Sequence, residues 1–140
     1  MIKYLLDTDT VSFLMKKKHP YHNTLFEKIR NHIESSIAIS VITLSEIQHG
    51  LEKTTDLNKK DLIQRALDKI LESFIVLEFN DDAAREYGKI RACLQALGQE
   101  IGIMDSMIAA HALSQGLTLV TNNLKHFQRI KSLTLENWTC

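Results

Sequence analysis

Residues 2–11 read IKYLLDTDTV, and the rest of the chain repeats the pattern that this stretch begins. The apolar run at residues 2–6 is short and predicts a buried strand, which ends at Asp7. Residues 8–15 place their apolar side chains on one helical face and predict a short helix. The chain is therefore expected to open with a strand and a helix, with a carboxylate at the turn between them.

Strands and helices alternate after this opening. Further strands are predicted at residues 37–40, 75–79, 117–121 and 133–135, and further helices at 21–33, 41–53, 58–74, 81–97 and 105–115. The buried stripe of helix 58–74 is expected to consist of Leu62, Ala66, Leu67, Ile70 and Leu71. The alternation is typical of an α/β fold, with a parallel sheet of about four to five strands flanked by helices. One proline and five glycines leave no linker, so residues 1–140 are expected to form a single domain.

The composition narrows the class of protein. The chain has 140 residues, 44% hydrophobic and 24% charged, as in an ordinary globular protein with its own core. Its formal net charge of +0 argues against a large nucleic-acid footprint, although a bound metal could supply positive charge at a phosphate. The two cysteines, Cys93 and Cys140, match no disulfide or zinc pattern and are expected to be free thiols. With no apolar run of roughly 18 residues and no signal-peptide pattern, we expect a cytoplasmic protein without a membrane segment.

The predicted strand ends bring three polar side chains to one edge of the sheet. Asp7 ends the first strand, and Thr121 and Asn123 follow the strand at 117–121. In such sheets ligands bind beyond the carboxyl ends of the strands. Asp105 is the most informative acid, because at about 100° per residue it falls at the centre of the apolar face of its helix. A carboxylate in a core is costly without a partner, and a metal ion would supply the missing charge.

Each acid also has an ordinary structural explanation. Asp105 could simply charge a helix N-terminus, Asp7 could be an N-cap, and Asp9 a first-turn acid. Glu46 lies away from the centre of its helix's apolar stripe, so periodicity alone predicts a solvated glutamate. If carboxylates do form the site, they favour Mg²⁺ or Mn²⁺ over zinc, since the six histidines show no zinc spacing.

The remaining histidines and basic residues have weaker interpretations. His111 is expected off the apolar face of its helix, whereas His49 and His126 could approach the acidic site. Two basic groups could guide a nucleic acid, although such groups are usually solvated surface. They are Lys16, Lys17 and Lys18, and a looser set of Lys125, His126, Arg129 and Lys131.

Four segments together resemble the blocks of PIN-domain ribonucleases, and more narrowly the VapC-type toxins of bacterial toxin–antitoxin pairs. The segments are YLLDTDTVSFL, ISVITLSEIQHGL, GQEIGIMDSMIAAHAL and LVTNNLKHF. Each is short, but their order, spacing and placement on strands and helices carry the resemblance across essentially the whole chain. The resemblance implies a PIN-like three-layer fold in which Asp7, Glu46 and Asp105 bind metal. Asn123 falls at a fourth, often acidic position, which weakens a second metal site, and Thr121 matches a hydroxyl that supports water or phosphate.

The resemblance also implies an activity and partners. A Mg²⁺-dependent endoribonuclease is expected, with Mn²⁺ as a possible substitute, which cuts RNA by metal-activated water and leaves a 5′-phosphate and a 3′-hydroxyl. Such proteins are typically homodimers, and a VapB-type antitoxin silences them by laying its C-terminal tail across the active-site groove. Within the family the chain looks most like the branch that cuts initiator tRNA.

Two other functions fit parts of the sequence. YLLDTDTV also fits the opening motif of haloacid dehalogenase-like phosphatases, with Asp7 as nucleophile and Asp9 as general acid. Ser40, Asp81 and Asp82 could complete that site. Alternatively, with Asn123 in place of an acid, the domain could bind RNA or a partner without cutting it.

Overall fold

The computed structural model describes residues 1–140 and contains five strands, seven α-helices and one 3₁₀ turn. The strands are β1 (Tyr4–Leu6), β2 (Ile37–Ser40), β3 (Ile75–Leu77), β4 (Thr118–Val120) and β5 (Leu135–Glu136). The helices are α1 (Thr8–Met15), α2 (His22–Arg30), α3 (Val41–Lys53), α4 (Leu57–Ser73), α5 (Asp81–Ala96), α6 (Ile103–Ser114) and α7 (Leu124–Phe127), with the 3₁₀ turn at Glu34–Ser36. The predicted α/β alternation is therefore confirmed, while α7 and the 3₁₀ turn were not predicted.

All strand pairs are parallel, and the strand order is β3-β2-β1-β4-β5. The chain builds outward from β1 through β2 to β3, and then returns to place β4 on the other side of β1. The direction of strand addition thus reverses between β1 and β4. Ligands of open α/β sheets bind at such a reversal, beyond the carboxyl ends of the two strands. Asp7 and Thr121 follow these two ends directly.

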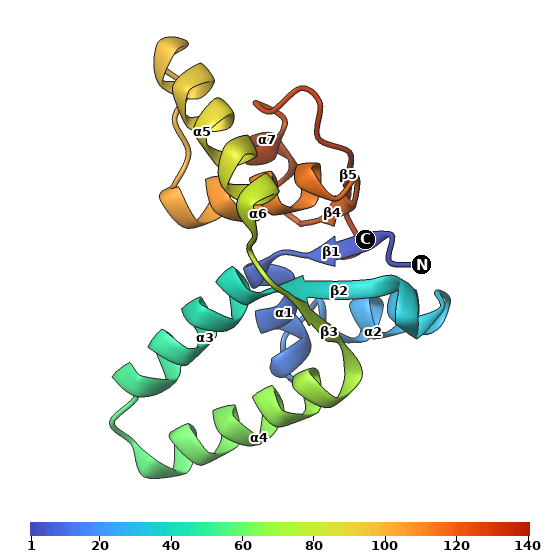
Figure 1. Ribbon diagram of the computed structural model, residues 1–140. Coiled ribbons are helices and arrows are strands. Elements are labelled where there is room, and N and C mark those ends of the chain that lie inside the picture. Colours follow the sequence, from blue (N-terminus) through green and yellow to red (C-terminus); the bar gives the residue numbers. More distant parts are fainter.

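Helices cover both faces of the sheet (Figure 1). Helices α5, α6 and α7 pack on one face, and α1, α2, α3 and α4 on the other. Successive strand residues point to opposite faces, so Leu5 joins the core under α5 and α6, and Leu6 joins the core under α1 and α3. Because both faces are covered, the central strands β1 and β2 are almost entirely apolar, as is usual in a buried parallel sheet.

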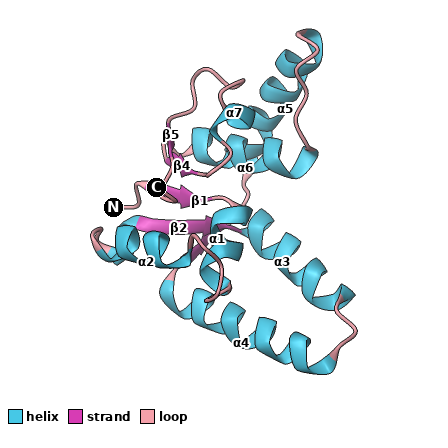
Figure 2. Cartoon of the chain, turned by 180° about the vertical axis from the view of Figure 1, so that it is seen from behind, coloured by secondary structure: helices cyan, strands magenta, loops and turns pink.

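Helices α3 and α4 form a hairpin that projects away from the sheet (Figure 2). The predicted stripe of α4 is only partly right, because Leu67 and Ile70 are buried but Leu62 and Leu71 are 65% and 38% exposed. Leu62 lies in the outer part of the hairpin, which projects beyond the sheet and leaves this leucine at the surface. The two cysteines are free, as predicted, and both are exposed. None of the helices has the length and apolarity that crossing a membrane requires.

Candidate active site

Asp7 lies at the turn between β1 and α1 and is only 3% exposed. Its Oδ1 accepts a hydrogen bond from the backbone N–H of Thr10 at 2.9 Å, so the side chain caps α1. Burial raises the pKa of Asp7 to about 6, and hydrogen bonds from Thr10 and Thr121 only partly offset this rise. The N-cap explanation of Asp7 is therefore correct as far as it goes, but it does not account for a charged group held so far from water.

Thr121 and Asn123 follow β4 and meet Asp7 at the same edge of the sheet. Thr121 is completely buried, hydrogen-bonds to Asp7, and accepts the backbone N–H of Asn123 at 3.0 Å. The threonine hydroxyl therefore connects the end of β4 to the carboxylate at the end of β1. Asn123 is exposed at the start of α7, and its side chain makes no capping hydrogen bond. Its amide is free to meet a ligand.

Glu46 comes to this edge from α3. It is half-buried, and its Oε1 accepts the hydroxyl proton of Thr8 at 2.6 Å. Thr8 and Thr43 hydroxyl oxygens lie 3.0 Å apart, and Thr43 must be the donor because Thr8 has already given its single proton to Glu46. Burial raises the pKa of Glu46, as do the charges of Asp105 and Asp9, against the lowering effect of Thr8. The prediction of a solvated glutamate from periodicity is wrong, and the metal-binding role that the family resemblance implies for Glu46 stays a prediction.

Asp105 lies in the first turn of α6 and faces the same acidic edge. Its side chain is 38% exposed, so the predicted placement of this carboxylate inside the core is wrong. The first turn of α6 extends past the sheet, and the neighbouring Ile103 and Met104 are also exposed there. Burial nevertheless raises the pKa of Asp105, and the nearby Asp9 adds to this, while His126 lowers it.

His126 approaches Asp105, as its sequence position allowed. Its Nε2 lies 3.3 Å from Asp105 Oδ2, but the angle makes no hydrogen bond, and this nitrogen is buried without a partner. His49 is exposed and makes no side-chain contact with the acids. A buried ring nitrogen without a hydrogen bond, beside the carboxylate of Asp105, marks a place where a further polar group could bind.

The donor set at this edge fits a hydrated hard cation. Asp7, Glu46 and Asp105 all have raised pKa values, and no lysine or arginine pairs with them. No three of the chain's His, Cys, Asp or Glu side chains form a ready chelate for a metal ion. Mg²⁺ takes only one or two carboxylates directly and keeps several waters, so a closed cage is not what it requires. The carboxylates and the Asn123 amide therefore suit Mg²⁺ or Mn²⁺ in chemistry and in number.

The phosphatase interpretation fails on geometry. Ser40, which it required beside the nucleophile, is completely buried and hydrogen-bonded to His111 instead. Asp81 and Asp82 are exposed in the first turn of α5, where Asp82 pairs with Arg85. These acids are helix-terminal charges at the surface.

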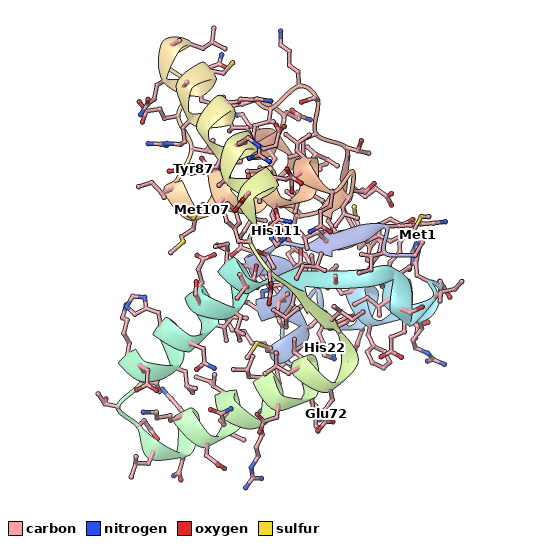
Figure 3. All side chains as sticks on the ribbon, in the orientation of Figure 1. Met1, His22, Glu72, Tyr87, Met107 and His111 are labelled. Carbon is pink, nitrogen blue, oxygen red and sulfur yellow. The ribbon has the colours of Figure 1, made fainter.

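His111 was placed wrongly by periodicity. It is completely buried, because α6 packs on α5 along one side and on the sheet along another, which leaves the middle of the helix no solvated face. Figure 3 labels it at the centre of the molecule. Burial lowers the pKa of His111, and a hydrogen bond to the Glu78 backbone partly offsets this.

Two of the four residues in the second basic group, His126 and Arg129, have other partners. The Arg129 guanidinium donates to the backbone carbonyls of Gln99 and Glu100, at 3.4 and 3.0 Å, and so ties down the loop before α6. Lys125 and Lys131 are exposed and remain free for a ligand, as do Lys16, Lys17 and Lys18. Sequence reasoning missed Thr43 and gave Thr8 no role, because their contacts join helices that are distant in the sequence.

Comparison with known proteins identifies the family of this chain. The PIN-domain family model matches residues 4–133. Ribonuclease VapC2 of Rickettsia felis is 40% identical over 137 residues, which cover 96% of this chain and 97% of that protein. The tRNA(fMet)-specific endonuclease VapC of Salmonella typhimurium is 38% identical over 138 residues, 99% of each chain. The crystal structure of VapBC2 from Rickettsia felis, bound to a DNA fragment from its promoter, superposes with a TM-score of 0.84 at 36% identity over 99% of each chain. The chain therefore belongs to the PIN-domain family and, within it, to the VapC ribonucleases.

Proposed function

We propose that this protein is a divalent-metal-dependent endoribonuclease that cuts tRNA and acts as the toxin of a toxin–antitoxin pair. The observation that supports the metal dependence is a set of three carboxylates with raised pKa values on the elements around the strand-order reversal of the sheet. The proposed substrate, initiator tRNA, rests on the 38% identity with the tRNA(fMet)-specific endonuclease of Salmonella typhimurium. Such a substrate would place the enzyme in the cytoplasm.

The proposed metal ligands are Asp7, Glu46 and Asp105, and the proposed ion is Mg²⁺, with Mn²⁺ as a substitute. When bound, the divalent ion would supply water activation and neutralise charge on the phosphate. Asp7 would hold it from the end of β1, with Thr121 fixing the carboxylate. Glu46 would present its second oxygen, because Thr8 occupies the first.

Asn123 and Lys125 are proposed to meet the RNA or its phosphate at the start of α7. Both are exposed, and both follow the end of β4, where substrates of this sheet type bind. A neutral amide at position 123 holds a cation less strongly than a carboxylate would, so a second metal ion would bind weakly without substrate. We further propose that residues 1–140 act as one PIN-like domain.

A cleft leads from the proposed active site along the α3–α4 hairpin, and we propose that an antitoxin segment occupies it. Thr8 and Glu46 line its inner end, and the cleft encloses ≈ 470 Å³. Its outer walls are mainly apolar and come from α1, α3 and α4. Such a surface suits a protein partner better than RNA. The VapBC2 complex of Rickettsia felis, whose toxin chain this protein resembles over 99% of its length, makes a VapB-type antitoxin the expected occupant. A homodimer is proposed from the same resemblance.

The test is cleavage of total bacterial RNA by protein freed of any bound partner, with Mg²⁺ and with EDTA, followed by sequencing of the new ends. A small set of EDTA-sensitive cuts in tRNA, lost in the Asp105→Asn variant, is the expected result. Asp61→Asn is a matched control, because Asp61 lies in an exposed pair with Arg65 on α4. If RNA binds but stays intact in excess Mg²⁺ and Mn²⁺, the chain is a non-catalytic binding module and the proposal is wrong.

A further inference from the structure

The proposed nuclease site makes no use of His111, which is the one completely buried histidine. Its Nδ1 lies 2.7 Å from Ser40 Oγ, and its ring packs edge-on against Phe79 with a centroid distance of 5.6 Å. A buried imidazole is retained in a core at a cost unless its polar atoms are paired. The donors and acceptors around the His111 ring therefore determine which of its nitrogens carries the proton.

The hydrogen-bond directions around Ser40 can be assigned. Ser40 Oγ accepts the backbone N–H of Ile42 at 3.0 Å, which caps α3. If His111 Nδ1 also donated to this oxygen, the serine proton would be left unpaired in a fully buried place. The serine therefore donates to Nδ1, and the ring carries its proton on Nε2, which lies 3.5 Å from the side-chain amide of Gln115. That amide then turns its oxygen toward the ring, since an N–H can donate only to an acceptor. The ring is neutral, in agreement with its burial.

This pair connects the helices that carry two of the proposed metal ligands. Ser40 caps α3, which carries Glu46 six residues later, and His111 lies on α6, six residues after Asp105. Among the side-chain hydrogen bonds of residues 1–140, the Ser40–His111 bond is the one that joins the β2–α3 segment to α6. The Thr8 hydroxyl independently joins α3 to α1. Together the two links fix α3 from two sides.

The position of Glu46 is sensitive to the tilt of α3. Six helical residues span about 9 Å, so a tilt of about 5° at Ser40 would move Glu46 by about 0.8 Å. Ligand side chains must be held to within about 0.5 Å of their working geometry. The α3–α4 hairpin projects away from the sheet (Figure 1), and Ile47 and Leu51 hold α3 by burial along its length. The Ser40–His111 bond adds a directional restraint at the base of α3, where a tilt would begin.

We propose that Ser40 and His111 form a buried latch that sets the distance between Glu46 and Asp105, so that His111 is a positioning residue for the metal site. The inference rests on the proposed metal-dependent function. It differs from a purely structural role in one measurable way. Removing the Ser40–His111 bond should weaken metal binding. A neighbouring substitution that lowers the fold stability by the same amount should weaken metal binding less.

The test is Mn²⁺ binding, followed by electron paramagnetic resonance of the free ion, for the parent protein and for Ser40→Ala and His111→Phe. Both variants should bind Mn²⁺ roughly tenfold more weakly, the size seen when groups that orient metal ligands are removed. The double variant should be no weaker than the weaker single variant, because both remove the same link. His111→Gln, which can accept from Ser40 and donate to Glu78, should restore binding to within about threefold of the parent.

Phe79→Leu is the matched control, because Phe79 contacts the same ring without a hydrogen bond. It should lower the melting temperature and leave Mn²⁺ affinity unchanged. Imidazole ¹⁵N shifts of the unaltered protein, assigned with His111→Gln, should report a neutral ring protonated at Nε2.

One result would overturn the latch, namely parent-like Mn²⁺ affinity in both Ser40→Ala and His111→Phe. A parent protein whose Mn²⁺ binding is absent, or is unaffected by Asp105→Asn, would instead overturn the proposed metal site and the latch with it. The two failures are therefore distinguishable.

Discussion

Replacing Asp7 with Asn should stabilise the metal-free protein at neutral pH. The folded pKa of Asp7 is about 6 and its ordinary value is 3.8, so the folded state holds this proton more tightly than the unfolded chain. The stability that the protonated carboxyl provides is fully present below pH 3.8 and is lost as pH rises through 6. The difference of 2.2 pKa units (6 − 3.8) corresponds to about 3 kcal/mol.

Asparagine cannot ionise, and its amide oxygen can still accept the Thr10 N–H. Asp7→Asn should therefore match the parent near pH 4 and exceed its free energy of unfolding by about 3 kcal/mol at pH 7.5 in EDTA. Mg²⁺ should reverse the order, because a bound cation stabilises only the protein that retains the carboxylate. Asp61→Asn, at an exposed pair, should shift stability by less than about 1 kcal/mol at every pH.

The assay is urea unfolding at fixed protein concentration between pH 4 and 8, followed by circular dichroism and by the fluorescence of Trp138. This single tryptophan is 2% exposed, so its emission reports loss of the core. A stability difference that does not grow between pH 4 and 7.5 would refute the reasoning. Destabilisation by Asp7→Asn at pH 7.5 without metal would do the same.

The remaining predictions concern the site and the cleft. Asp105→Asn should reduce RNA cleavage in a gel assay by at least about 100-fold, while the midpoint of unfolding stays the same or rises. Activity near that of the parent protein would contradict the role of Asp105 as a metal ligand. Cleavage at fixed Mg²⁺ should increase as pH rises through about 6, the pKa of Asp7, because protons compete with the metal for the carboxylates. The pKa values of Glu46 and Asp105 are raised as well, so higher Mg²⁺ should move this increase in cleavage to lower pH. An increase whose pH does not depend on the Mg²⁺ concentration would contradict this competition. Thr8→Val should raise the Mg²⁺ concentration for half-maximal activity roughly tenfold, because the Thr8 hydroxyl holds Glu46. Thr8→Ser keeps the hydroxyl and should return this concentration to the parent value. Equal effects of both variants would show that the packing of the threonine methyl group, and not the hydroxyl, is responsible. Leu62→Asp should weaken antitoxin binding in a pull-down without changing the melting temperature, because Leu62 lines the cleft and is 65% exposed; unchanged binding would place the antitoxin elsewhere.

Much of the fold follows from local signals in the sequence. The bounds of α1, β2 and α3 match their predictions residue for residue. Gly98 and Gly116, predicted to end helices, both adopt a positive φ, of 64° and 65°. These features depend on neighbours in the chain, on apolar period and on turn chemistry, which a single sequence displays. The alternation of strands and helices also determined that Asp7 and Thr121 would meet, since parallel strands end at one edge.

The helical side chains of the site were decided by tertiary packing. Periodicity describes each helix against its own apolar residues, and it placed Glu46 in solvent, Asp105 in the core and His111 off the apolar face. The structure differs at all three, because Thr8 supplies a hydroxyl to Glu46, Asp105 is 38% exposed, and Ser40 and Phe79 cover His111. Each outcome depends on which neighbouring element covers a given helix face, and that is set by the strand order and not by the spacing of residues within the helix.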